Sequence, residues 1–505
     1  MIEIAIAPKM VALLVAWVTL PFFTGFVIYL LPKLARFMAL GITLISAVYA
    51  GQIFWQSSPV NIQLLDSFGV SLIIDRLSGF FILTNALVTA AVIIYCWQTG
   101  KTAFLYMQVI ILHGSVNATF VCADFISLYV ALEVISIGAF LLISYPRSDR
   151  SIWVGLRYLF VSNTAMLFYL VGALLVYKAN NSFHYQGLAN CPPEAVALIF
   201  LGLLAKGGIF VTGLWLPLTH SESESPVSAM LSGVVVKAAV FPMVRCALLL
   251  EEIDPVVRFF GVGTALLGVL WAMFAKDTKR TLAFSTVSQL GFILAAPVVG
   301  GFYALTHGLV KSTLFLIAGV LPSRSFQDLR DRGIDTKVWL VLAIASFSIS
   351  GFPLLSGFGA KILTSKNLLP WQVIAMNVAT VGTVITFAKF IFLPHGKSAS
   401  HQNVMVRVDG VTGGQGDGEK KIQSGFWWAM VILLGGLIGA NVVYYEAYTL
   451  TNIVKPLVTI AIGWLAYFLV FKKLVVKLPR GVEELDNLIG VMSLMLILIF
   501  WMVRV

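Results

Sequence analysis

The chain has 505 residues, of which 59% are hydrophobic and 11% charged, whereas soluble domains carry about 25% charged residues. This composition excludes an ordinary soluble protein and indicates a polytopic protein of the lipid bilayer. The net charge of +11 does not indicate nucleic-acid binding, because the basic residues are dispersed singly and form no basic face interleaved with aromatic residues.

Sixteen apolar stretches are each about long enough to cross a bilayer as a helix. The sequence therefore predicts an all-α fold of about 14–16 transmembrane helices. In chain order the stretches are 10–31, 34–54, 77–98, 104–122, 124–145, 154–177, 194–216, 227–249, 256–275, 281–299, 303–321, 338–363, 370–394, 425–445, 455–471 and 487–503.

The basic residues between these stretches predict the orientation of the chain. With sixteen spans, twenty Lys and Arg fall on the side of the odd-numbered connections, eight fall on the side of the two termini, and six lie inside spans. Because cytoplasmic loops carry the excess of basic residues, both termini are predicted outside the cytoplasm. The one long polar connection, 395–424, is rich in Gly, Ser and charge and is predicted to be a flexible cytoplasmic loop.

Four ionisable residues lie near the middle of predicted spans: Glu133, Lys206, Lys237 and Lys311. Each is about 12–18 Å from a span end in a helix, near the midplane of a core about 30 Å thick. A charge at that depth costs about 2.5–3.5 kcal/mol on insertion scales, so a function is expected to offset the cost.

Other ionisable residues in spans differ from these four in their distance from a span end or in the titratable residues near them. Arg157 and Lys389 lie a few residues from span ends, where long side chains can reach the interface. His307 lies four residues before Lys311 on the same helical face, which adds a second titratable group to that span. His113 has no such neighbour and is interpreted as a histidine of the packed core.

Two interpretations of the buried charges remain. They could be buried ion pairs that hold helices together, but one carboxylate cannot pair with three lysines, and such pairs are weak stabilisers. Buried lysines near one another can instead exchange protons near neutral pH. We therefore favour a proton relay.

Backbone breaks are predicted inside two spans. Lys206 is followed by Gly207 and Gly208, and 350–361 contains three glycines and a proline before Lys361. Interrupted helices at matching places in two halves are typical of transporters, because freed carbonyls can face a hydrated cavity. Lys361 would lie deeper than a straight helix allows if the span unwinds near 351–353.

Cofactor and metal sites are not indicated. Four separated cysteines, Cys96, Cys122, Cys191 and Cys246, form no CxxC and have no histidine at ligand spacing. The sequence contains no GxGxxG and no haem-ligation pattern, so the chain by itself is not expected to transfer electrons.

These residues stand in motifs that resemble the antiporter-like subunits shared by the membrane arm of respiratory complex I and by Mrp-type Na+/H+ antiporters. The similarity covers about 300 residues in the family's order. The motifs are DRLSGFF at 75–81, LE at 132–133, WLP at 215–217, SPVSA at 225–229, VK at 236–237, HGLVK at 307–311 and GFPLLSGFGAK at 351–361.

The resemblance implies two inverted five-helix repeats. The expected organisation is N-terminal spans at 1–103, repeats at 104–250 and 251–394, the loop at 395–424, and C-terminal spans at 425–505 of unassigned role. It also implies that Glu133 and Lys206 form a modulating pair, that Lys237, His307 and Lys311 continue a hydrated axis, and that Lys361 ends the path.

The resemblance leaves several functions open. Ser232 stands where many complex I members have histidine, and the usual aspartate after WLP is absent. These departures favour a proton- or cation-translocating subunit of a multisubunit antiporter, carrying H+ and with Na+ as a candidate ion. The alternatives are a membrane subunit of a quinone-reducing complex, an energy-coupling subunit for another uptake such as inorganic carbon, and a solitary carrier of an organic solute. Other membrane subunits are the expected partners, in a prokaryotic plasma membrane or another energy-coupling membrane.

Overall fold

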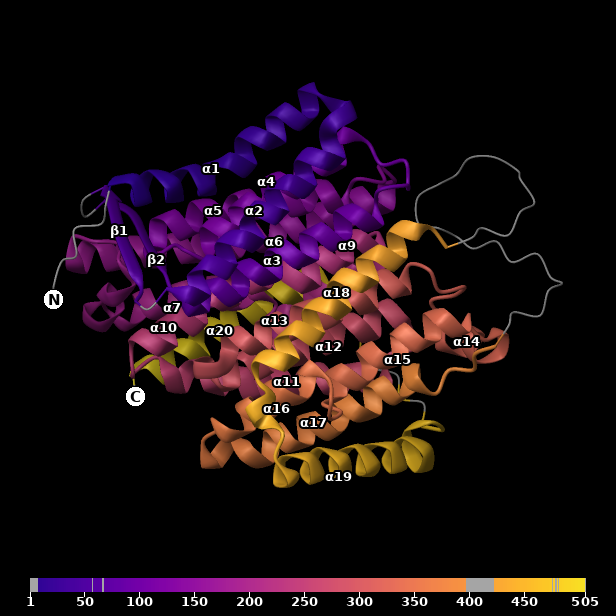
Figure 1. The fold of residues 1–505 in the computed structure, drawn as a ribbon. Coiled ribbons are helices and arrows are strands. Elements are labelled where there is room, and N and C mark those ends of the chain that lie inside the picture. Colours follow the sequence, from indigo (N-terminus) through magenta and orange to yellow (C-terminus); the bar gives the residue numbers. More distant parts are fainter. Residues whose placement is uncertain are drawn as a thin grey trace.

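The computed structural model is a bundle of long helices that run roughly side by side, with one small β-hairpin at an end (Figure 1). Within the described residues, thirteen helices are long and apolar enough to cross a membrane. The structure describes residues 8–56, 58–65, 68–396, 422–474, 476, 479 and 481–504.

All sixteen predicted stretches coincide with helices, which confirms the all-α membrane fold. Three of the stretches are not among these thirteen, and they correspond to α4, α12 and the pair α15 and α16. Most of the predicted loop, 397–421, lies outside the described residues.

The N-terminal part contains three helices and the hairpin. Their bounds are α1 (Pro8–Leu30), η1 (Pro32–Leu34), α2 (Ala35–Trp55), β1 (Val60–Leu65), β2 (Gly69–Ile74) and α3 (Arg76–Tyr95). The strands pair antiparallel with Val60 opposite Ile74, an element that the sequence analysis did not anticipate. The hairpin is tied to the bundle because the Ile73 amide donates to the Val121 carbonyl at 2.8 Å.

The next helices correspond to the first predicted repeat. They are α4 (Ala103–Thr119), α5 (Phe125–Ile143), α6 (Asp149–Asn180), η2 (Tyr185–Asn190), α7 (Pro193–Gly207), η3 (Phe210–Trp215), α8 (Leu216–Glu222), α9 (Ser225–Met230), the π-helical turn η4 (Leu231–Val235) and α10 (Lys237–Leu249).

The second predicted repeat and the C-terminal part follow. They are α11 (Asp254–Phe274), α12 (Thr278–Ala295), η5 (Pro297–Val299), α13 (Gly300–Ala318), α14 (Phe326–Arg332), α15 (Thr336–Ser350), α16 (Ser356–Lys366), α17 (Pro370–Ile391), α18 (Ser424–Val443), η6 (Tyr445–Ala447), α19 (Leu450–Ala466), η7 (Tyr467–Phe471), η8 (Gly481–Glu483) and α20 (Leu485–Arg504).

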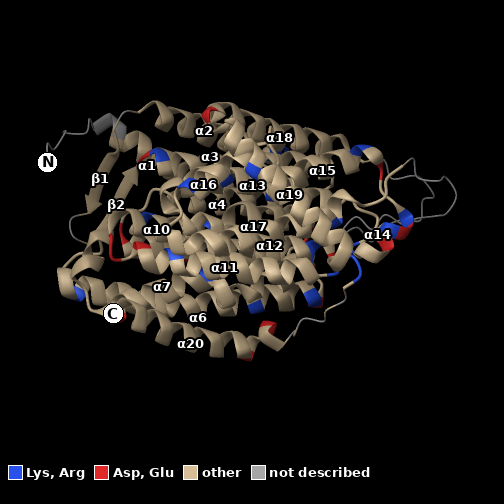
Figure 2. Cartoon of the chain, turned by 90° about the horizontal axis from the view of Figure 1, so that it is seen from below, with Lys and Arg blue, Asp and Glu red and all other residues tan. Residues whose placement is uncertain are grey.

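Different elements mark the two ends of the bundle. α1 begins and α20 ends on the side of the β-hairpin, which we call the hairpin side, and α14 lies at the opposite end, the α14 side (Figure 1). Figure 2 shows charged residues around α14 and few along the outer helices. Both termini of the described chain therefore lie on one side, as the span count predicts.

The last two helices pack on different halves of the bundle. α19 lies against α17, whereas α20 lies against α6 and α7. On the α14 side, Glu483 before α20 pairs with Arg280 at the start of α12, at 2.5 Å. The C-terminal helices therefore contact both predicted repeats.

Two spans are interrupted at the predicted places. α7 ends at Gly207, and Gly208 adopts the left-handed conformation with φ +70° before η3 turns the chain into α8. α15 ends at Ser350, and Gly351 at φ +84° opens an irregular stretch before α16 begins at Ser356. Each interruption falls in the fourth span of a predicted repeat, which favours the two-repeat organisation.

An ion pair on the hairpin side links the start of α3 to α10. The Asp75 carboxylate caps α3 by accepting from the Ser78 amide at 2.9 Å and pairs with the Arg245 guanidinium, whose Nη2 donates at 3.0 Å. Burial alone would raise the pKa of Asp75, but the hydrogen bond and charge of Arg245, with the Ser78 amide, hold that pKa below its ordinary value.

We expect Asp75→Asn to lower the stability of the detergent-solubilised protein by about 2–3 kcal/mol, because the buried Arg245 would lose its carboxylate. Thermal unfolding at pH 7 measures this loss. Arg150→Ala is the control, since the Arg150–Glu222 pair is 3.5 Å apart and its arginine side chain is 56% exposed.

The same pair predicts a pH dependence. Because the folded pKa of Asp75 is lowered, its contribution is complete above the ordinary aspartate pKa and is lost as the pH falls through the folded value. The wild-type protein should therefore lose more stability on acidification than Asp75→Asn. Parallel curves for the two proteins would contradict this assignment.

We also expect Gly351→Ala to destabilise the protein by about 1–2 kcal/mol, because an L-residue is strained at φ +84°. A Cβ at this position would lie 2.9 Å from Cδ of Lys361, so the lysine would have to shift. Gly359→Ala is the matched control within α16, since its nearest neighbour would be Phe302 at an ordinary 3.8 Å. Equal thermal stability of the two variants would show that the break tolerates a side chain.

Candidate functional site: a row of buried ionisable groups

Lys206 lies in the last turn of α7, directly before the break, and is 4% exposed. Its ammonium donates to the Ser136 hydroxyl of α5 and to the Ser162 hydroxyl of α6 at 2.5 Å. The Tyr158 ring centre lies 5.8 Å away. Neutral hydroxyls and an aromatic face therefore surround this ammonium, and among the described residues no carboxylate pairs with it.

Glu133 lies on α5, three residues before Ser136 and so on the same helical face. Its side chain is half-buried, and Oε1 has no hydrogen-bond partner. The charges of Glu133 and Lys206 act on one another. Within the described residues, however, no ion pair joins them. Their charges therefore interact at a distance, without a salt bridge.

Lys237 begins α10, directly after the π-helical turn η4, and is fully buried. Its ammonium donates to the backbone carbonyls of Ser232 at 3.0 Å and Gly233 at 2.8 Å. A π turn widens the backbone and disturbs the regular α-helical hydrogen bonds, which leaves carbonyls free to accept from a side chain. The chain thus supplies backbone oxygens where a buried ammonium needs them.

His307 and Lys311 face the same region from α13. His307 is 3% exposed, has no partner on either ring nitrogen, and lies where the charges of Lys237 and Lys311 both act on it. Lys311 is fully buried and donates to the Leu282 carbonyl at 3.0 Å and to the Ser285 hydroxyl. The structure therefore brings Lys237, His307 and Lys311 together.

Lys361 lies on α16, apart from this group. Its ammonium has no hydrogen-bond partner and stands 5.4 Å from the ring centre of Phe292 on α12. Its stem passes Gly351, so the break in the twelfth span determines where the side chain runs.

Uncharged polar groups between Lys361 and His307 were missed by the sequence analysis. Tyr303, one turn before His307, donates to Gln289 at 2.6 Å, and Gln289 donates to Thr383 at 3.3 Å. The Tyr303 ring also stacks on Phe292. In the sequence, the signal for these groups is that Tyr303 lies one helical turn from the titratable His307. That spacing alone does not distinguish a hydroxyl on a proton path from a hydroxyl of the packed core.

The remaining ionisable residues in spans lie outside this row. His113 is satisfied as predicted, by Ser46 at 2.9 Å and Thr89 at 3.2 Å. Lys389 differs from the expected interfacial anchor: it is 8% exposed and donates to the Ala272 and Ala275 carbonyls at the end of α11. Arg157 is 9% exposed and lies 5.8 Å from the Trp153 ring centre.

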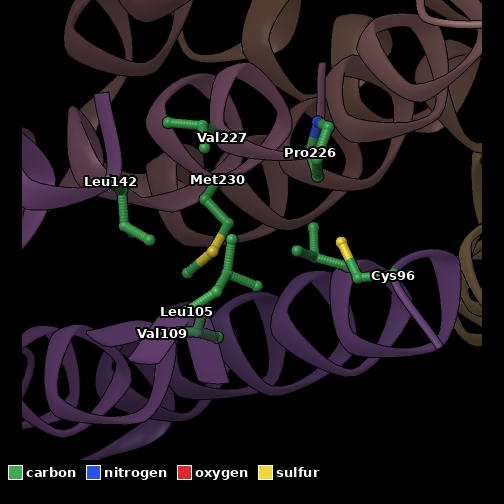
Figure 3. Close-up of a pocket in the computed structure, with 8 residues that line it drawn as sticks. Cys96, Leu105, Val109, Leu142, Pro226, Val227 and Met230 are labelled. Atoms are coloured by element: carbon green, nitrogen blue, oxygen red, sulfur yellow. The ribbon is translucent and has the colours of Figure 1, made fainter. Parts of the chain in front are cut away.

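An apolar pocket between α3, α4, α5 and α9 is separate from the row (Figure 3). Its lining is aliphatic except for Cys96, Pro226 and Met230. Apart from the Cys96 thiol this lining has no titratable group, and the pocket contains no residue of the row.

The chain is similar to known membrane proteins. The chain is 26% identical over 420 residues to an NAD(P)H-quinone oxidoreductase chain 4 of Trichodesmium erythraeum, covering 75% of each protein. It is 25% identical over 414 residues to a Na(+)/H(+) antiporter subunit of Alkalihalophilus pseudofirmus, covering 74% of this chain and 84% of that protein.

Two solved complexes contain subunits of the same fold. A chain of the archaeal membrane-bound sulfane sulfur reductase superposes with a TM-score of 0.72 at 22% identity, covering 88% of this chain and 99% of the other. A chain of the Mrp complex from a Dietzia species gives 0.71 at 20% identity, covering 94% and 98%. Residues 122–386, more than half of the chain, match the transmembrane family of NADH:quinone oxidoreductases and Mrp antiporters, and the protein belongs to this family.

Proposed function

We propose that this protein is a proton- or cation-translocating subunit of a multisubunit cation:proton antiporter of the Mrp type. The observation that carries the proposal is the row of buried ammonium and imidazole groups, which have no carboxylate partner among the described residues, beside two interrupted helices. Family membership and the similarity to a Na(+)/H(+) antiporter subunit support it. The protons would move along Glu133, Lys206, Lys237, His307, Lys311 and Lys361.

The arrangement supports proton exchange for a physical reason. A buried ammonium held only by carbonyls and hydroxyls loses little when it releases its proton, since no buried anion is left uncompensated. His307, with both nitrogens free, can accept a proton on one side of the ring and release one on the other. The same proposal includes Na+ as the exchanged cation. It also places the protein in a plasma membrane, with the α14 side facing the cytoplasm.

A second candidate is a proton-translocating subunit of a quinone-reducing complex. It is favoured by the similarity to NAD(P)H-quinone oxidoreductase chain 4. In such a complex, redox chemistry in other subunits would drive proton transfer along the same row of residues. This chain would then carry protons and no electrons. Energy coupling to another uptake process, such as that of inorganic carbon, is a variant of this candidate.

The proton row predicts that Lys206→Ala and Glu133→Ala each abolish formation of a pH gradient in everted membrane vesicles, with insertion and assembly retained. Removing Lys206 breaks the row at α7, and removing Glu133 withdraws the negative charge that acts on it. The measurement is fluorescence quenching of a pH-sensitive amine dye. Normal gradients in both variants would contradict the relay.

Lys389→Ala is the matched control for a buried lysine outside the row. Its ammonium closes the carbonyl end of α11, so its loss should lower thermal stability while gradient formation in the assembled complex stays within about twofold. A loss of transport as complete as that of Lys206→Ala would undermine the separation of the two lysines.

Mild-detergent purification from native membranes distinguishes the two candidates. Co-purification with several small membrane proteins, and no redox subunit, is expected for the antiporter. Co-purification with flavin and iron–sulfur subunits would instead establish the oxidoreductase. Mass spectrometry of the purified complex and its visible absorption spectrum give the answer.

A further inference from the structure

Ser232 lies in the π turn η4 and carries a buried hydroxyl that the proposed row does not use. This hydroxyl is hydrogen-bonded to the Thr286 hydroxyl of α12, with the two oxygens 2.7 Å apart, and both side chains are fully buried. A buried Ser or Thr in a helix commonly bonds to the carbonyl four residues before it. Ser232 bonds to another helix instead, so its hydroxyl joins two elements that are 54 residues apart in the chain.

Each residue of this pair shares a carbonyl contact with a lysine of the row. The Ser232 carbonyl accepts from the Lys237 ammonium at 3.0 Å. Thr286 donates its hydroxyl to the Leu282 carbonyl at 3.0 Å, and the Lys311 ammonium donates to that same carbonyl at 3.0 Å. The hydroxyl pair therefore connects the backbone that holds one lysine with the carbonyl that holds the other.

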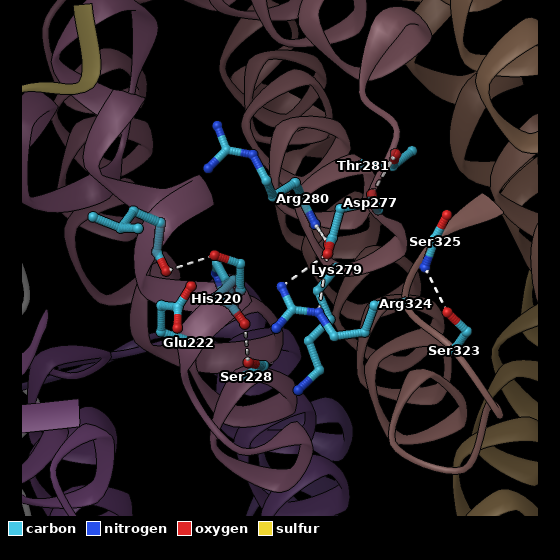
Figure 4. A network of polar contacts seen from close by, with 12 residues as sticks. His220, Glu222, Ser228, Asp277, Lys279, Arg280, Thr281, Ser323, Arg324 and Ser325 are labelled. Atoms are coloured by element: carbon cyan, nitrogen blue, oxygen red, sulfur yellow. Dashed lines mark hydrogen bonds and ion pairs between the residues drawn. The ribbon is translucent and has the colours of Figure 1, made fainter. Parts of the chain in front are cut away.

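The two sides of the pair differ in how firmly their backbone is held. The first turn of α12 is fixed on the α14 side, where Asp277 accepts from the Arg280 amide at 2.9 Å and from the Arg324 guanidinium at 3.0 Å (Figure 4). Ser232 lies in a π turn, where the regular α-helical hydrogen bonds are disturbed. We expect a change in the hydrogen bonds of Thr286 to be taken up in the π turn rather than in α12.

The Leu282 carbonyl has more donors than lone pairs. It lies inside α12, where it accepts from the amide four residues further on, and a carbonyl oxygen has two lone pairs. The Thr286 hydroxyl and the Lys311 ammonium therefore compete for the second lone pair. A charged donor forms a bond about twice as strong as a neutral one, so the ammonium prevails while Lys311 is protonated.

A second hydroxyl pair occurs at another lysine of the row. The Ser136 hydroxyl of α5 and the Ser162 hydroxyl of α6 lie 3.0 Å apart, and both accept from Lys206. Ser136 also donates to the carbonyl four residues before it at 3.0 Å, as Thr286 does. Among the residues that the structure describes, these are the two hydroxyl bonds between Ser or Thr side chains of different elements, and each occurs at a buried lysine.

We propose that the hydroxyls of Ser232 and Thr286 form a switch through which the charge on Lys311 affects the π turn that holds the next lysine of the row. This inference rests on the proposed proton transport and adds two positioning residues to it. With Lys311 protonated, Thr286 donates to the Ser232 oxygen, and the Ser232 hydrogen turns away from the pair. With Lys311 neutral, Thr286 donates to the carbonyl in its own helix and accepts from Ser232. Both hydroxyls keep their hydrogens, so no covalent bond breaks.

Proton conduction tests the switch without depending on the energy source. The complete purified complex is reconstituted in liposomes, a potassium gradient with valinomycin imposes a potential, and a trapped pH dye reports proton uptake. Thr286→Val keeps the shape of the side chain and removes its hydroxyl, and Ser232→Ala removes the other hydroxyl. We expect each variant to slow uptake by about tenfold, the largest effect that one internal hydrogen bond commonly has.

Three further variants distinguish a switch from packing. The double variant Ser232→Ala/Thr286→Val should lose no more than either single variant, because removing one partner already breaks the pair. Thr286→Ser keeps a donor and an acceptor and should conduct within about twofold of the wild-type rate. Thr313→Val is the matched control on α13, since the Thr313 hydroxyl donates to the Leu309 carbonyl of its own helix, and it should conduct normally.

The outcomes separate the switch from the row. Wild-type conduction in Thr286→Val or Ser232→Ala overturns the switch, and so does an additive loss of about a hundredfold in the double variant. A loss in Thr286→Ser or Thr313→Val equal to that in Thr286→Val overturns it as well, because the paired hydroxyl would then not be the cause. If Thr286→Val does not assemble, Thr286→Ala is compared with Thr286→Ser in the same way.

Lys311→Ala keeps this test apart from the test of transport. Wild-type conduction in that variant overturns the proposed transport itself, since it removes a member of the row. Lost conduction in Lys311→Ala beside normal conduction in both hydroxyl variants overturns the switch alone.

Discussion

The structure depends on one constraint: several ammonium groups lie in the interior of an apolar bundle with almost no negative charge beside them. Within the described residues, no ion pair involves Lys206, Lys237, Lys311 or Lys361. A buried ammonium without a partner is costly, so the chain must provide oxygens of another kind. It provides serine hydroxyls to Lys206 and backbone carbonyls to Lys237 and Lys311.

Irregular backbone supplies the carbonyls that Lys237 binds, whereas Lys311 binds the Leu282 carbonyl within the regular helix α12. In the interior of a regular helix each carbonyl already accepts from the amide four residues further on, so a carbonyl released from that pattern is a better acceptor for a side chain. The π turn before Lys237 and the breaks after Lys206 and before Lys361 depart from that rule inside spans. In a membrane such departures are tolerated only where protein or water surrounds them, and here they coincide with the titratable groups.

The same arrangement suits proton transfer better than static stabilisation. A closed salt bridge would hold each proton in place, because separating the charges in the interior is costly. Hydroxyls, carbonyls and aromatic faces stabilise the ammonium form only moderately. In the proposed transport, His307, whose two ring nitrogens have no hydrogen-bond partner, adds an imidazole to this row of cations.

The sequence by itself determined the membrane class, the sixteen apolar stretches that form helices, and the breaks at Gly208 and Gly351. These follow from local properties: apolar length and the conformational freedom of glycine. Tertiary structure decided which groups meet, because that depends on how distant helices pack. Only the fold showed that Glu133 and Lys206 do not close a salt bridge and that Lys389 caps α11. The partners of Lys206 and Lys311 come from other helices, which no spacing along the chain encodes, whereas those of Lys237 lie in the π turn just before it.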